Sequence, residues 1–93
     1  MGMRYPTIWK FPIEITDEQD VMVPGGAEFL RAAMQGEKLC LWALVDAGSP
    51  HEMRRIRVIG TGLPFEDSDK CKYIGTAHDH RGAVWHVFEK VRK

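Results

Sequence analysis

Apolar and polar residues alternate with a period of two along most of this 93-residue chain. In Thr7–Ile13 the alternation places Trp9 and Phe11 on one face, which predicts a half-buried strand. Because Pro12 cannot donate a hydrogen bond to a ladder, we expect this strand at a sheet edge. Residues 39–45 are apolar on both faces, which predicts a central strand that is covered on each side.

The middle and end of the chain repeat the same pattern between turns. The polar residues 16–20 predict a turn, and a short strand follows at 21–23. Residues 53–61 alternate, so Arg55 and Arg57 point the same way. Residues 72–78 and 83–90 form two further strands, and the turn between them ends at Gly82, where we expect a positive φ angle.

The run that starts at Ala27 and ends at Gln35 is ambiguous. Its composition favours a helix that stops at Gly36, but it is only about two turns long, lacks an N-cap residue and leads directly into a strand. A short hairpin connection explains that arrangement better, so we favour a strand here. The chain is therefore predicted to be mostly β, a small antiparallel sandwich or barrel of about seven short strands.

Length and charge narrow the function classes. The chain has room for one domain, residues 1–93. Thirteen basic residues balance thirteen acidic ones, which argues against coating long nucleic acid or docking on an anionic membrane. With neither an apolar leader nor a run of about 20 apolar residues, we expect a cytoplasmic protein.

Patterns for catalysis or metal binding are weak. His78 and His80 flank a predicted turn without a third ligand, and Cys40 and Cys71 lack metal-site spacing, so we expect no metal and no cofactor. No serine or cysteine lies in a pattern typical of a nucleophile. A binding protein is favoured over an enzyme.

The most suggestive features are an echo, Ile-Gly-Thr at 59–61 and again at 74–76, and a set of arginines and tryptophans. Glycine within a strand indicates a bend, a bulge or close approach to a ligand, and a period of fifteen predicts adjacent strands. Arginines can hold phosphate, tryptophans can stack on a base, and threonine hydroxyls can bond a sugar. The candidate ligand-binding residues are Trp42, Arg55, Arg57, Gly60, Thr61, Gly75, Thr76, Trp85 and His86. The same tryptophans could instead build the core, and the glycines could only turn the strands.

Several blocks of the chain resemble a family of short phage and prophage proteins of unknown function. These blocks are Ile-Trp-Lys-Phe at 8–11, Leu-Trp-Ala-Leu-Val-Asp at 41–46, Gly-Thr-Gly at 60–62 and His-Val-Phe-Glu at 86–89. The resemblance spans residues 7–89, and it implies a phage setting for the protein more than a mechanism. Small phage proteins of this kind resemble counter-defence factors, among them the Sequestin and Lockin sponges that sequester nucleotide immune signals such as the ADP-ribose derivatives of Thoeris systems.

The function expected from residues and resemblance together is sequestration, without cleavage, of an anionic nucleotide signal by a homo-oligomer in the infected host. One alternative is a protein-binding inhibitor of a host enzyme. A second is a small nucleotide hydrolase with His86 or His78 as its base.

Overall fold

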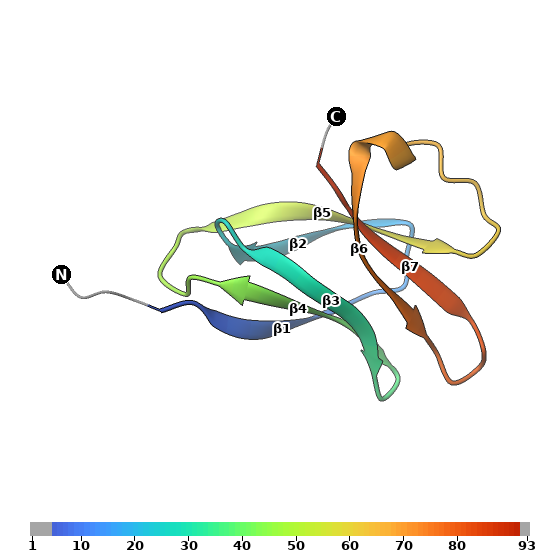
Figure 1. Ribbon diagram of the computed structural model, residues 1–93, viewed down its shortest axis with the longest axis horizontal. Helices are drawn as coiled ribbons and strands as arrows, with labels where there is room; N and C mark the ends of the chain where they lie inside the picture. The colour runs from blue at the N-terminus through green and yellow to red at the C-terminus, as the bar shows by residue number, and fades with distance from the viewer. Residues whose placement is uncertain (1–4, 92–93) are drawn as a thin grey trace.

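The computed structural model of the protein describes residues 5–91, so residues 1–4 and 92–93 of the predicted domain lie outside it. Seven β-strands and one short 3₁₀ helix follow one another along these residues (Figure 1). They are β1 (Thr7–Ile13), β2 (Glu18–Pro24), β3 (Glu28–Gln35), β4 (Lys38–Val45), β5 (His51–Gly60), η1 (Ser68–Lys70), β6 (Cys71–His78) and β7 (Val84–Lys90).

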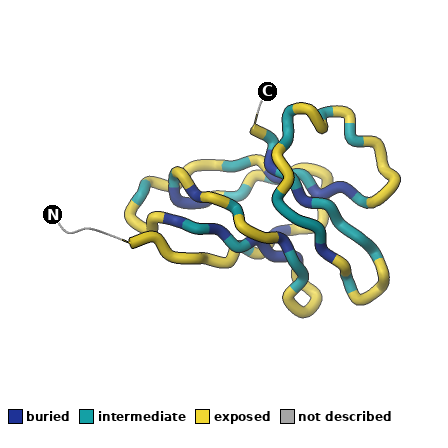
Figure 2. The backbone as a smooth tube through the Cα atoms, viewed as in Figure 1, coloured by how far each residue is buried: buried dark blue, intermediate teal, exposed yellow. Residues whose placement is uncertain are grey.

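The strands form two antiparallel sheets that pack face to face. One has the order β1-β4-β3 and the other β2-β5-β7-β6. Every strand sends buried apolar side chains into the space between the sheets, among them Leu41, Ile56 and Val87, which are fully buried. The longest buried runs lie within strands and not in loops (Figure 2). The prediction of a mostly β antiparallel sandwich or barrel is confirmed, and the two separate sheets make it a sandwich. Burial of each large core side chain stabilises it by about 1.5–3 kcal/mol.

β3 and β4 show how tertiary pairing overrides local propensity. β3 is a strand, as we favoured, and it pairs with β4 from Gln35 opposite Lys38 onward. Gly36 makes the tight connection with a φ angle of 61°. Buried Ala32 then faces the core, which a short isolated helix would not achieve. β4 is the central strand of its sheet and β1 is an edge strand, both as predicted.

The predicted turn at residues 16–20 is wrong over its second half. β2 begins at Glu18 and pairs with β5, so that Asp20 lies opposite Arg55. Acidic residues have low strand propensity, but here their carboxylates bond to arginines on the neighbouring strand. That cross-strand pairing cannot be seen in a local window of sequence.

The two sheets come together most closely where β3 passes β6. Each of these strands has a break in register, between Phe29 and Arg31 in β3 and between Tyr73 and Gly75 in β6. Bulges bend a strand and increase its twist, which lets the two sheet edges meet. At the meeting point Gly75 lies directly against the main chain of Ala32.

Candidate functional site

A chain of hydrogen bonds joins four polar side chains on the outer face of the four-stranded sheet, the face turned away from the core. His86 on β7 is its centre. The Nε2 atom of His86 lies 2.7 Å from Oγ1 of Thr61, and its Nδ1 atom lies 3.2 Å from Oγ1 of Thr76. The hydroxyl of Tyr73 lies 2.6 Å from the same oxygen of Thr76. Three of these four residues are sequence-predicted ligand-binding residues.

The two Ile-Gly-Thr copies meet through β7 and not through each other. The expectation that they mark adjacent strands is wrong, because β7 lies between β5 and β6. His86 stands opposite Ile59 on one side and opposite Thr76 on the other. Apolar residues occupy both faces of β7, which suits its interior position between β5 and β6. One imidazole therefore bridges the threonines of both copies.

Beside His86 the outer face is hollowed by a cavity of about 240 Å³. Its walls are largely apolar and aromatic, with the hydroxyl of Thr61 and the imidazole of His86 as polar groups. The lining residues are Ile59, Gly60, Thr61, Gly62, Leu63, Phe65, His86 and Phe88. Because ligand pockets typically enclose at least about 300 Å³, this hollow suits one ring of a ligand better than a whole nucleotide.

The loop at residues 61–67 forms the outer wall of the hollow. The ring of Phe65 packs edge-on against Phe88, with centroids 4.8 Å apart. The guanidinium of Arg57 lies 5.4 Å from the centroid of the Phe65 ring and forms an ion pair with Asp67 in the same loop. Lys90 adds a second cation 3.3 Å from Asp67. Aromatic packing and ion pairs together hold the loop on the sheet.

The two predicted phosphate-binding arginines already have protein partners. Arg57 donates from Nε to the main-chain oxygen of Asp17 at 2.8 Å, in addition to its pair with Asp67. Arg55 bonds Asp20 at 2.9 Å and Glu18 at 3.0 Å. A phosphate would have to displace these carboxylates. Displacement is easier at Arg55, whose side chain is 46% exposed, than at Arg57, which is 12% exposed.

Acidification is expected to weaken these pairs and the fold with them. The guanidiniums of Arg55 and Arg57 hydrogen-bond to Asp20 and Asp67 and hold the pKa of each carboxyl below its ordinary value. Such groups stabilise the fold above their unfolded pKa of about 3.9, and this contribution is lost as pH falls through the folded pKa. The thermal unfolding midpoint, measured from about pH 7 to pH 2, should therefore decrease once the pH is below about 4.

The variant Asp67→Asn should flatten this acid-induced fall in the midpoint, because it removes one of the groups that must be protonated. Asp69→Asn, two residues away in η1 and outside the ion pairs of residues 5–91, is the matched control. The explanation is refuted if Asp67→Asn and the control respond to pH alike.

The remaining predicted residues lie elsewhere. Trp42 is on the outer face of the three-stranded sheet, opposite Lys10 on β1. Trp85 packs against the core, and its indole N–H donates to Asp79 at 3.2 Å. Gly75 faces β3, as described above. Of the predicted set, the structure thus gathers the two threonines, His86 and Gly60, with the two arginines further along the same face of β5.

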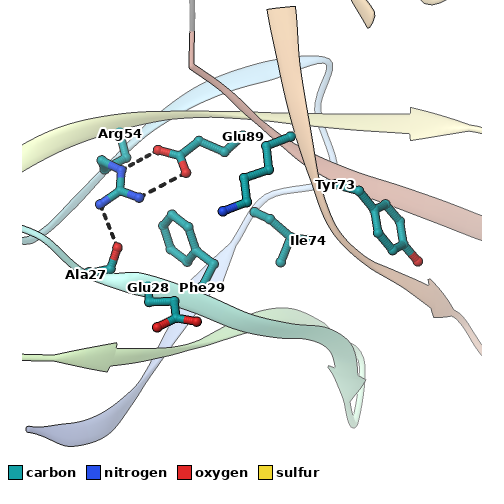
Figure 3. Close-up of a pocket in the computed structure, with 8 residues that line it drawn as sticks. Ala27, Glu28, Phe29, Arg54, Tyr73, Ile74 and Glu89 are labelled. Atoms are coloured by element: carbon teal, nitrogen blue, oxygen red, sulfur yellow. Dashed lines mark hydrogen bonds and ion pairs between the residues drawn. The ribbon is translucent and has the colours of Figure 1, made fainter. Parts of the chain in front are cut away.

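A second cavity, of about 210 Å³, lies between β3 and β6 (Figure 3). Arg54 and Glu89 are paired along one side of it, with Phe29 and Ile74 near them. Four hydrogen bonds hold the Arg54 guanidinium, one of them at 3.0 Å to the main-chain oxygen of Ala27. The ion pair thus connects β5 and β7 to the start of β3. These bonds brace the two sheets, and they leave this guanidinium little capacity for a ligand.

Two further findings concern metal binding and membrane crossing. Among residues 5–91, His, Cys, Asp and Glu side chains do not gather in any group of three that could hold a metal ion. Within the same residues, no helix has the length and apolar character needed to cross a membrane.

Comparison with protein families gives one assignment. Residues 5–93 match a family described as a domain of unknown function, DUF7352. The chain belongs to the DUF7352 family. No curated protein and no solved structure matches this DUF7352 chain.

Sequence reasoning missed three aromatic or hydroxyl-bearing members of the DUF7352 site: Tyr73, Phe65 and Phe88. Phe88 carried a usable signal, since it shares a face with His86 two residues away. Phe65 carried none, because it lies in an acidic loop whose fold depends on the ion pair between Arg57 and Asp67. The site in this DUF7352 domain is therefore a polar cluster joined to an aromatic hollow.

Proposed function

We propose that this domain is a non-catalytic binding protein that captures a small nucleotide-type ligand on the outer face of its four-stranded sheet. One observation carries the proposal: His86 hydrogen-bonds both Thr61 and Thr76 at the edge of an aromatic hollow. Hydroxyl and imidazole groups recognise the edges of a base or a ribose, and aromatic walls accept a ring.

The arrangement suggests how a nucleotide would lie. Its base would enter the hollow between Leu63 and the rings of Phe65 and Phe88. Its phosphates would extend along β5, where Arg57 and then Arg55 lie on the same face as Thr61. Exchange of one anion for another at a solvated arginine costs little, because an exposed ion pair contributes only about 0–1 kcal/mol. Arg55 is the better phosphate contact for that reason.

The biological setting is part of the same proposal. The resemblance to short phage proteins makes a nucleotide immune signal the first ligand class to test, with the domain acting as a counter-defence sponge in the host cytoplasm. Homo-oligomer formation stays a prediction here.

The test is calorimetric titration of the purified protein with linear and cyclic ADP-ribose species and with cyclic dinucleotides. His86→Ala should weaken binding at least tenfold, because it removes the bridge between the threonines, and about 1.4 kcal/mol corresponds to that factor. His51→Ala, at the exposed start of β5, is the matched control and should bind like the wild type. Absence of binding by the wild type to every one of these ligands would sink the proposal.

Mass spectrometry separates a sponge from the hydrolase alternative. The protein is incubated with a nucleotide mixture, washed and boiled, and the released compound is identified. A sponge releases the ligand unchanged. A hydrolase that uses His86 as a base would release a product instead.

The protein-binding alternative has its own observation. On the outer face of the three-stranded sheet, Ile8 is 56% exposed beside the half-buried Leu44 and Trp42. Exposed apolar patches mark protein-binding surfaces when they are contiguous. Recovery of one stoichiometric host protein with the wild type, and its loss with Trp42→Ala, would favour this alternative over ligand capture.

A further inference from the structure

The outer edge of β1 is an open strand edge flanked by exposed apolar side chains. β1 is the last strand of its sheet, and no strand within residues 5–91 pairs with its far side. Ile8 on one face is 56% exposed and Trp9 on the other is 38% exposed. Tyr5, just before the strand, is 83% exposed. An open edge with apolar neighbours is a template for pairing with another strand.

Pro12 indicates which main-chain groups this edge presents. A proline is accommodated on an edge strand where its missing N–H would point to solvent. In an antiparallel ladder the residues alternate between pointing toward the partner strand and away from it. With Pro12 directed outward, Ile8 and Lys10 also direct their N–H and C=O groups outward, while Trp9 bonds to Ala43 on β4.

We propose that two copies of this chain join through β1, antiparallel about a two-fold axis at Trp9, so that the two three-stranded sheets become one six-stranded sheet. In this register Ile8 of each copy stands opposite Lys10 of the other, and both outward N–H groups find an acceptor. Pro6 and Pro12, each three residues from Trp9, then stand opposite one another beyond the two ends of the paired residues 7–11, where the proline carbonyls that find no donor remain open to water.

Neighbouring registers are less favourable. An axis at Lys10 brings two ammonium groups together and places Ile8 opposite Pro12, which has no N–H to give. An axis at Ile8 pairs only residues 7–9 of the two β1 strands, whereas an axis at Trp9 pairs residues 7–11. At the edge of the other sheet, Glu18 and Asp20 of β2 share the single guanidinium of Arg55, so self-pairing there would bring two patches of residual negative charge together.

The proposed register makes a direct geometric statement about Trp9. It stands opposite its own copy in a pair without mutual hydrogen bonds, where Cα atoms are about 4.5 Å apart. That lies within the roughly 4.4–6.8 Å that a disulfide spans. Thr7 is opposite Phe11, so the two copies of Thr7 are separated by at least about 13 Å along the strand.

The first experiment is oxidative cross-linking of cysteine variants of the full chain, read on a non-reducing gel. Trp9→Cys should form a covalent dimer, whereas Thr7→Cys and the wild type, which keeps Cys40 and Cys71, should not. Cross-linking of Thr7→Cys in place of Trp9→Cys, or of neither variant, overturns the register. A Trp9→Cys variant that fails to fold is replaced by the second measurement.

The second experiment is light scattering up to millimolar concentration. The wild type should show twice the 10.6 kDa mass of the chain. Lys10→Pro should be monomeric with an unchanged far-ultraviolet circular dichroism spectrum, because it removes an N–H that points away from β4. A wild type that stays monomeric throughout, or a Lys10→Pro variant that remains fully dimeric, overturns the proposal.

Discussion

Replacement of Glu89 by alanine is expected to lower the free energy of unfolding by about 3 kcal/mol. The change leaves the Arg54 guanidinium, only 17% exposed, without its main counter-ion. Removal of one partner from a buried pair typically costs about 3–5 kcal/mol, and the lower end applies because Glu52 remains 3.2 Å away. For a domain of this size the thermal midpoint should fall by more than about 10 °C, measured by calorimetry or circular dichroism.

Two further variants separate the ion pair from a general effect of losing a carboxylate. Glu28→Ala removes an exposed glutamate beside the same cavity and should change stability by less than about 0.5 kcal/mol. The double variant Arg54→Met with Glu89→Leu should recover most of the loss, because apolar groups of similar size can replace a buried pair. If Glu89→Ala and Glu28→Ala behave alike, the bracing role assigned to the ion pair is wrong.

Gly75→Ala is expected to destabilise the fold by about 1–3 kcal/mol. A Cβ atom at this position would lie 2.9 Å from the main-chain nitrogen of Ala32 and 3.2 Å from its Cβ. Because these are atoms of a paired strand, β3 and β6 must separate to admit it. The sheets would then lose their closest contact, and chemical denaturation should show a lower midpoint.

Gly60→Ala, at the matching position of the other Ile-Gly-Thr copy, is the control. Its Cβ would meet the tip of Leu63 at 3.2 Å, and that flexible side chain can move. The gain of about 0.4–1 kcal/mol from restricting the unfolded chain should offset the adjustment, leaving stability nearly unchanged. Equal losses in the two variants would show that the approach of Gly75 to β3 is not what makes a glycine necessary there.

Much of the fold follows from local pattern. The alternation in residues 53–61 placed Arg55 and Arg57 on one face, and the structure keeps them there beside Glu18 and Asp67. The run at 39–45 is apolar on both faces, which favours a strand with neighbours on both sides, and it became the central β4. The start of β2 was not predictable in this way. Its acidic residues are in a strand only because β5 supplies the arginines.

The candidate site was predictable in its members more than in its assembly. Thr61, Thr76 and His86 were all selected from sequence, but nothing local showed that they contact one another. Their contact depends on β7 lying between β5 and β6. Thr61 and His86 are 25 residues apart in the sequence, so no local pattern joins them. Trp42 and Trp85 were selected with equal reason, but Trp42 lies on the outer face of the other sheet and Trp85 packs against the core. Which of several tryptophans faces a site is set by strand order, which periodicity does not encode.

The sequence by itself determined most of the strands, their faces and the glycines and threonines of the repeated Ile-Gly-Thr, because side-chain direction in a strand depends on the nearest neighbours alone. Only the tertiary structure decided what each copy of that repeat does. Gly75 leaves room for the main chain of β3, Gly60 lines the hollow, and both threonines hydrogen-bond to the imidazole of His86. These roles arise from contacts between strands distant in the chain, whose order is set by burial of the whole core and not by any single segment.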